Sequence, residues 1–116
     1  METTETKIRT QKETISFEDF EKLDIRICTI MEIEKIPKTD KLYKMKIHTG
    51  IDERTVVSAI ADKFSEEKLL HRNMPFILNL APRTVKGIES QAMIILAEGN
   101  ERLDIIPGFE RGAIVI

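Results

Sequence analysis

Hydrophobic and polar residues alternate along several short segments of the chain, the pattern typical of half-buried β-strands. The longest such segment, residues 23–33, places five apolar side chains on one face: Leu23, Ile25, Ile27, Met31 and Ile33. Cys28 and Ile30 interrupt the opposite, polar face. This interruption predicts a long strand that curls and passes from one sheet to another.

Four further strands are predicted at 43–48, 54–60, 74–80 and 92–97. Two short helices are predicted where Ser16 and Ser65 can cap residues 17–20 and 66–72, each with acidic residues in the first turn. Residues 82–90 are predicted to form a basic loop. Five strands with one short helix between the third and the fourth predict an all-β protein, a five-stranded OB-fold barrel with terminal extensions.

The domain prediction is one unit over 16–116, preceded by a mobile arm over 1–15 that has no apolar period. The 116 residues are 41% hydrophobic and 33% charged, as in soluble globular domains. No apolar run approaches the ~20 residues needed to span a bilayer. The first residues also lack the apolar core of a secretory signal. We therefore expect a cytoplasmic protein with no membrane contact.

Candidate catalytic and metal-binding groups are few. Cys28 is the one cysteine, which excludes an intramolecular disulfide and a four-cysteine zinc site. It lies within a predicted strand, while His48 and His71 each end an element without an obvious partner. No glycine-rich phosphate loop, HExxH or GxSxG motif is present. The sequence predicts no catalytic residue, no metal and no cofactor.

Charge is unevenly distributed along the chain. The net charge of -2 argues mildly against nucleic-acid binding, yet residues 36–55 hold five basic and three acidic residues. Lys44, Lys46 and His48 project from one side of a predicted strand about 7 Å apart, close to the spacing of successive phosphates, and Lys41 precedes them. A solvated outer face is the alternative interpretation of these lysines.

The predicted loop 82–90 adds Arg83 and Lys86, next to Asn79, Ser90 and Gln91. All five phenylalanines lie in patterns that predict packing, and Tyr43 is predicted to point inward. Proteins that bind single-stranded nucleic acids stack the bases on exposed aromatic rings. Cations without such rings favour folded RNA, bound by shape and backbone.

The tail contains more apolar residues than a solvated segment needs. Because the predicted barrel is complete without this tail, we expect these residues to be buried in an isologous homodimer interface. They are Ile105, Ile106, Phe109, Ile114, Val115 and Ile116.

Five segments in order resemble the tRNA-binding domain family, from about Ser16 to the C-terminus. They are 20–27 (FEKLDIRI), 37–47 (PKTDKLYKMKI), 57–61 (VSAIA), 79–83 (NLAPR) and 87–93 (GIESQAM). The family includes the C-terminal domain or beta subunit of methionyl-tRNA synthetase, separate tRNA-binding dimers and a chaperone-like protein. The run Gly87–Gln91 favours the synthetase-type branch. The resemblance implies an OB fold, a homodimer and a non-catalytic tRNA binder, free or as an accessory subunit of methionyl-tRNA synthetase; a chaperone-like peptide binder is the alternative.

By position, the resemblance implies tRNA contacts through Lys41, Ser58, Asn79, Arg83, Ser90, Gln91 and Met93. With the three lysines Lys44, Lys46 and Lys86, these residues form the predicted RNA-binding set. The chain departs from the family in having Cys28, Ala59 and Ala92 where glycine is common, and Ala81 and Thr84 where lysine is common.

Overall fold

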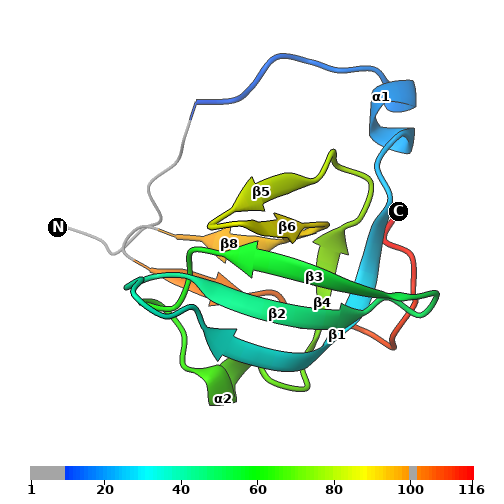
Figure 1. Cartoon of the computed structure of the whole chain (residues 1–116). Helices are drawn as coiled ribbons and strands as arrows, with labels where there is room; N and C mark the ends of the chain where they lie inside the picture. Colours follow the sequence, from blue (N-terminus) through cyan, green and yellow to red (C-terminus); the bar gives the residue numbers. More distant parts are fainter. Residues whose placement is uncertain (1–9, 100–101) are drawn as a thin grey trace, which may run out of the picture.

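The computed structural model describes residues 10–99 and 102–116 (Figure 1). Residues 10–15 are exposed and have no helix or strand, whereas the rest of the predicted arm, residues 1–9, lies outside the described part. The elements in chain order are α1 (Phe17–Glu21), β1 (Ile25–Lys35), β2 (Tyr43–His48), β3 (Glu53–Ser58), α2 (Glu66–Leu69), β4 (Asn73–Ile77), β5 (Arg83–Val85), β6 (Ile88–Ser90), β7 (Met93–Ile94), β8 (Leu96–Glu98) and β9 (Leu103–Ile105).

β1 is the long curled strand at the centre of the fold. Its second half pairs with β2 and its first half with β4, both antiparallel. The register with β2 shifts between Ile30 and Glu32, so Met31 is a bulged residue. Residues 27–30 are all buried, because a strand with this much curl is covered on both faces. The interrupted polar face at Cys28 and Ile30 therefore correctly indicated the curl, but β1 does not pass to another sheet, because β2 and β4 belong to the same one.

Five strands form one antiparallel sheet in the order β3-β2-β1-β4-β7, with α2 between β3 and β4 in the chain. The sheet curls until β3 approaches the segment after β6, where the Gln91 amide donates to the Thr55 carbonyl at 2.8 Å. The core inside the curl contains Cys28, Tyr43, Met45, Phe76 and Ile94. This is an OB-like barrel, which confirms the predicted fold class.

The residues predicted as a basic loop form a β-hairpin instead. β5 and β6 pair over Arg83↔Ser90, Thr84↔Glu89 and Val85↔Ile88. The two residues at the turn, Lys86 and Gly87, both have positive φ, 52° and 78°. Two positive φ values are characteristic of the type I′ turn, whose twist matches that of the strands. The hairpin thus holds the predicted cations at defined positions.

Residues after 101 lie outside the five-stranded sheet but pack on it. β9 pairs with β8, and Leu103 and Ile105 pack against the core. Farther on, the Val115 amide donates to the Ile25 carbonyl and the Ile27 amide to the Ala113 carbonyl, both at 2.9 Å. The C-terminal residues therefore lie along the first half of β1, on the edge that β4 leaves open.

Two other expectations need correction. The second helix ends at Leu69 because the next backbone groups pair with β1, the His71 amide donating to the Ile30 carbonyl at 2.7 Å. Phe17 and Phe109 are not buried in the barrel, being 71% and 72% exposed, although the ring centroids of Phe17 and Phe20 lie 6.3 Å apart. Phe64, Phe76 and Tyr43 are buried as predicted. Within the described residues, no helix is long and apolar enough to cross a membrane.

Candidate nucleic-acid interface

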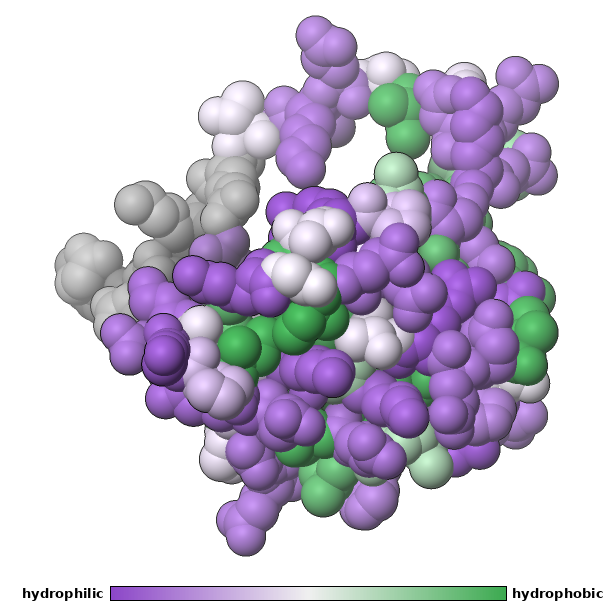
Figure 2. Space-filling model, in the orientation of Figure 1, coloured by the Kyte–Doolittle hydropathy of each residue, from purple (hydrophilic) through white to green (hydrophobic). Residues whose placement is uncertain are grey.

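A groove of about 720 Å³ lies between the edge of β3 and the segments after β4 and β6. Its floor and walls are mostly apolar, and hydrophobic side chains are visible on this face among hydrophilic ones (Figure 2). Ser58, Arg83, Ser90 and Met93 all line it, although they are up to 35 residues apart in the chain. The fold therefore brings four residues of the predicted RNA-binding set to one place.

Arg83 is the cation of this groove. It begins β5 directly after Pro82, and its side chain is exposed. Within residues 10–99 and 102–116, the guanidinium forms no ion pair and no hydrogen bond. An arginine held near an apolar surface with its donors unused is suited to bind a phosphate through two parallel hydrogen bonds.

Two lysines extend the positive charge on either side of the groove. Lys86 is exposed at the tip of the β5–β6 hairpin. Lys41 is exposed on the loop before β2, and its carbonyl accepts from the Ala61 amide at 2.7 Å. That bond places the loop beside the end of β3, where Ser58 and Ala59 form one wall of the groove.

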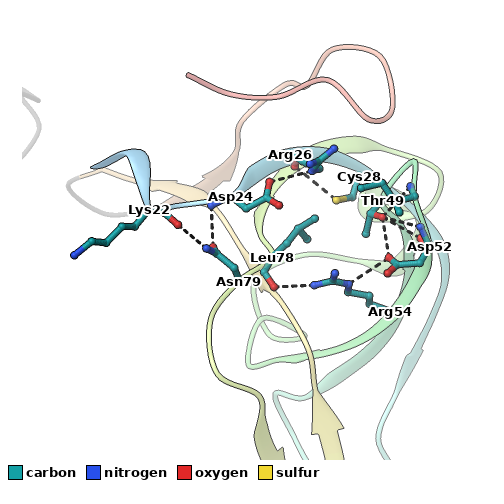
Figure 3. A network of polar contacts seen from close by, with 10 residues as sticks. Lys22, Asp24, Arg26, Cys28, Thr49, Asp52, Arg54, Leu78 and Asn79 are labelled. Atoms are coloured by element: carbon teal, nitrogen blue, oxygen red, sulfur yellow. Dashed lines mark hydrogen bonds and ion pairs between the residues drawn. The ribbon is translucent and has the colours of Figure 1, made fainter. Parts of the chain in front are cut away.

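The side chains of three predicted contact residues form hydrogen bonds to other parts of the protein. The Asn79 carboxamide accepts from the Asp24 amide at 2.8 Å and donates to the Lys22 carbonyl at 2.5 Å (Figure 3). The Ser90 hydroxyl is buried and accepts from the Val57 amide at 3.0 Å. The Gln91 side-chain carbonyl accepts from the Thr55 amide at 2.9 Å. Ser90 and Gln91 therefore hold β3 against the end of β6 beside the groove, whereas Asn79 ties the segment after β4 to the residues before β1.

Replacing Ser90 with alanine is expected to destabilise the protein. The Val57 amide would lose its partner in a buried place, at a cost of about 1–3 kcal/mol. Thermal unfolding followed by circular dichroism should show a lower Tm than wild type. Thr84→Ala, an exposed position on the neighbouring strand, is the matched control and should leave the Tm nearly unchanged. Equal Tm values for Ser90→Ala and wild type would contradict a structural role for this hydroxyl.

The lysines of β2 lie outside the groove and face acidic residues. Lys44 and Lys46 are exposed on the side of β2 opposite the core. Their cross-strand neighbours on β1 are Glu34 and Glu32. Opposite charges directly across an antiparallel pair attract each other, which lowers the positive field of the lysines. The structure thus gives weight to the solvated-face interpretation of this stripe.

Arg54, another cation of the basic region 36–55, stabilises the fold through intramolecular hydrogen bonds. Its guanidinium donates to the Leu78 carbonyl at 2.7 Å and to Asp52 at 3.3 Å (Figure 3). The Thr49 hydroxyl lies 2.9 Å from the same carboxylate, and this hydrogen bond, with Arg54, lowers the pKa of Asp52. Arg54 and Asp52, two charged residues of this region, therefore stabilise the β2–β3 turn and its contact with the end of β4.

The candidate nucleophile is inert. Cys28 is fully buried in β1, and burial raises the pKa of its thiol to about 12. A thiol that stays protonated is a poor nucleophile. Among the described residues, no three His, Cys, Asp or Glu side chains gather closely enough to hold a metal ion.

The departures from the family pattern are accommodated without backbone strain. Cys28, Ala59 and Ala92, which stand at glycine positions, do not have positive φ; the non-glycine residues with positive φ in the described part are Lys38, His71 and Lys86. Ala59, Ala81 and Ala92 all line the groove. Sequence reasoning did not identify Leu80, Leu96, Glu98 and Leu103 as groove residues, because no local pattern distinguishes them from core or loop.

Comparisons with known proteins agree with this geometry. The family model described as "Putative tRNA binding domain" matches residues 25–113. The methionine–tRNA ligase of Flavobacterium johnsoniae is 50% identical over 95 residues, 82% of this chain, and that of Porphyromonas gingivalis is 52% identical over 86 residues, 74% of this chain. The chain spans about 13% of the length of each of these relatives.

Solved structures show the same fold. A methionyl-tRNA-synthetase-related protein from Pyrococcus horikoshii superposes with a TM-score of 0.86 at 35% identity, over 90% of this chain and all of that one. The CsaA chaperone protein from Picrophilus torridus superposes with a TM-score of 0.80 at 23% identity, over 89% of this chain and all of that one. The second likeness is one of fold alone. With a family model that matches most of its length and relatives at half identity, the chain belongs to the tRNA-binding domain family.

Proposed function

We propose that this protein is a non-catalytic tRNA-binding protein that binds folded tRNA by its shape and phosphate backbone. The observation that carries the proposal is the convergence of Ser58, Arg83, Ser90 and Met93 on one groove of an OB barrel. The neighbourhood of strands two and three is the side on which OB folds bind nucleic acids. Arg83, with unused donors, and the exposed Lys41 and Lys86 supply the positive charge.

Eight of the ten residues in the predicted set have one of three roles in this proposal. Lys41, Arg83 and Lys86 contact phosphates, whereas Asn79, Ser90 and Gln91 hold the segments that carry them. Lys44 and Lys46 contribute only to the long-range attraction of RNA, because Glu34 and Glu32 lie across from them. Such binding depends on phosphates and not on base identity, so it is tolerant of tRNA sequence.

The proposed active form is a homodimer. Phe17, Phe109, Ile114 and Ile116 are strongly exposed, and α1 and the C-terminal residues lie at the same end of the molecule (Figure 1). Val115 and Ala113 direct their backbone groups to β1, so those of Ile114 point to the outer side. A second copy related by a two-fold axis would bury these side chains. Ile105, predicted for this interface, packs partly against the core of its own barrel.

Methionyl-tRNA synthetase is the proposed partner. The matched segment is 13% of the methionine–tRNA ligases of Flavobacterium johnsoniae and Porphyromonas gingivalis. A domain that binds tRNA without base preference can raise the affinity of a linked or associated enzyme for the same tRNA through effective concentration. The protein would act free in the cytoplasm or as an accessory subunit of the enzyme.

A salt titration tests the proposal. Binding of a transcribed methionine tRNA and of an unrelated tRNA, measured by fluorescence anisotropy, should weaken steeply as salt rises, because each phosphate contact releases counterions. The second candidate is a chaperone-like peptide binder, which the apolar lining of the groove favours. Reduced, carboxymethylated lactalbumin, an unfolded chain held by apolar burial, should bind weakly and with little salt dependence. Tighter binding of this unfolded chain than of tRNA at physiological salt would reverse the order of the two functions.

A further inference from the structure

We propose that the groove beside Arg83 receives one unpaired nucleobase of the bound RNA, with the phosphate of that nucleotide on the Arg83 guanidinium. This inference rests on the proposed function and adds to it a place where the protein contacts a base. The contact is apolar and does not depend on which base is present.

The first support is the exposure of apolar side chains at the groove. Met93 is 52% exposed and Leu80 is 43% exposed, and both line it above a buried floor that includes Val56 and Ile94. A volume of about 720 Å³ lies within the range of small-molecule pockets, about 300–1,000 Å³. The site therefore has the size and the surface for a flat, mostly apolar ligand.

The second support is the arrangement of polar groups around that apolar surface. Arg83 lines the groove beside its apolar floor. A phosphate is attracted to the Arg83 guanidinium, which orients a nucleotide with its phosphate on β5 and its base over that floor. The Ser58 hydroxyl, on the β3 wall, makes no hydrogen bond within the described residues and can bond to a base edge or a ribose hydroxyl.

A nucleotide fits this combination better than an apolar peptide does. Bases removed from a stack are held between apolar or aromatic side chains in protein pockets. An unfolded apolar peptide would use Leu80 and Met93 but would offer the Arg83 guanidinium no anionic group. Folded tRNA carries unpaired bases in its loops, whereas a continuous RNA duplex does not.

Methionine methyl groups provide the test, because Met93 lines the groove whereas Met31, Met45 and Met74 do not. In full-length protein labelled with methyl-¹³C methionine, adding tRNA should shift the Met93 methyl resonance upfield, as a base face covers it. Met45 and Met74, fully buried in the core, are internal controls and should not move. A blunt RNA duplex with the same number of phosphates should bind without shifting Met93.

Substitution gives an independent measurement. Met93→Ser should weaken tRNA binding by about fivefold, the lower end of base-stacking effects, and leave the salt slope unchanged because no phosphate contact is lost. Ile51→Ser, at a 68% exposed position on the β2–β3 turn, is the matched control and should have no effect. Carboxymethylated lactalbumin should not shift the Met93 resonance.

The outcomes separate this inference from the proposed function. Salt-dependent tRNA binding with an unmoved Met93 resonance overturns the inference and leaves the function standing. An equal shift with the duplex also overturns it, since no unpaired base is then required. A Met93 shift with the unfolded chain but not with tRNA assigns the groove to peptides. No detectable tRNA binding rejects the proposed function itself.

Discussion

Arg83→Ala is expected to weaken binding of all tRNAs alike, by about 10-fold or more. The loss corresponds to a charge-assisted hydrogen-bonding group worth about 1.5–3 kcal/mol. Removing one phosphate contact should also make the salt slope shallower by about one unit. Because the guanidinium has no ion pair or hydrogen bond in the described part of the chain, the Tm should stay near that of wild type. Anisotropy titrations at several salt concentrations and thermal unfolding measure both quantities on one variant.

Two further variants sharpen this result. Arg83→Lys should recover only part of the affinity, because a lysine cannot form the two parallel hydrogen bonds of a guanidinium. Arg72→Ala removes the same charge from an exposed site after α2 and should change affinity little. A lower Tm with an unchanged salt slope for Arg83→Ala would instead indicate that Arg83 holds the hairpin through Glu89 or Asp40.

Gly108→Ala is expected to release the C-terminal residues from the barrel. A Cβ at this position would lie 2.2 Å from the Asn73 carbonyl oxygen and 2.6 Å from its carbon, both backbone atoms at the start of β4. The loop must therefore move away, and the hydrogen bond that the Asn73 side-chain carboxamide donates to the Phe109 carbonyl at 3.0 Å would be lost. Overpacking of this kind costs about 1–3 kcal/mol, which should lower the Tm by several degrees.

The same variant tests the proposed dimer. Light scattering at micromolar concentration should give the mass of two chains for wild type and a lower mass for Gly108→Ala, since Phe109 and Ile114 are carried by the displaced segment. Gly99→Ala is the matched control, because its Cβ would make only an ordinary contact at 3.7 Å. A wild-type protein that is monomeric without aggregation would end the dimer proposal. A truncation after residue 100 is unsuitable, because it removes β9 from the barrel.

The positions of the first four strands along the chain and the curl of β1 could be predicted because they depend on local patterns. Alternation identified β2, and the apolar interruption at Cys28 and Ile30 indicated where β1 is covered on both faces. Both serine caps were predicted correctly, since Ser16 and Ser65 accept amide hydrogen bonds from residues three positions later. Such features need only neighbours in the chain.

The RNA-binding set could be predicted only in part. Residue type and family position identified Arg83 and Met93, which the structure places together at one groove. Nothing local distinguished Lys46 from Lys86, both of which are exposed. Lys46 lies across from Glu32 on the neighbouring strand, whereas Lys86 lies at the tip of the β5–β6 hairpin. The effect of a charge depends on what lies opposite, and the sequence does not show which residues are opposite.

The sequence by itself determined both helix starts, the strands β1 to β4, the fold class and the family, because alternation, caps and motifs each depend on a few neighbouring residues. Tertiary structure alone decided that the side chains of Asn79, Ser90 and Gln91 form hydrogen bonds to backbone groups of distant segments. It also decided that residues after 101 pack against the core and along the first half of β1. Both outcomes depend on segments more than 30 residues apart meeting in space, and such contacts form only when the whole sheet curls.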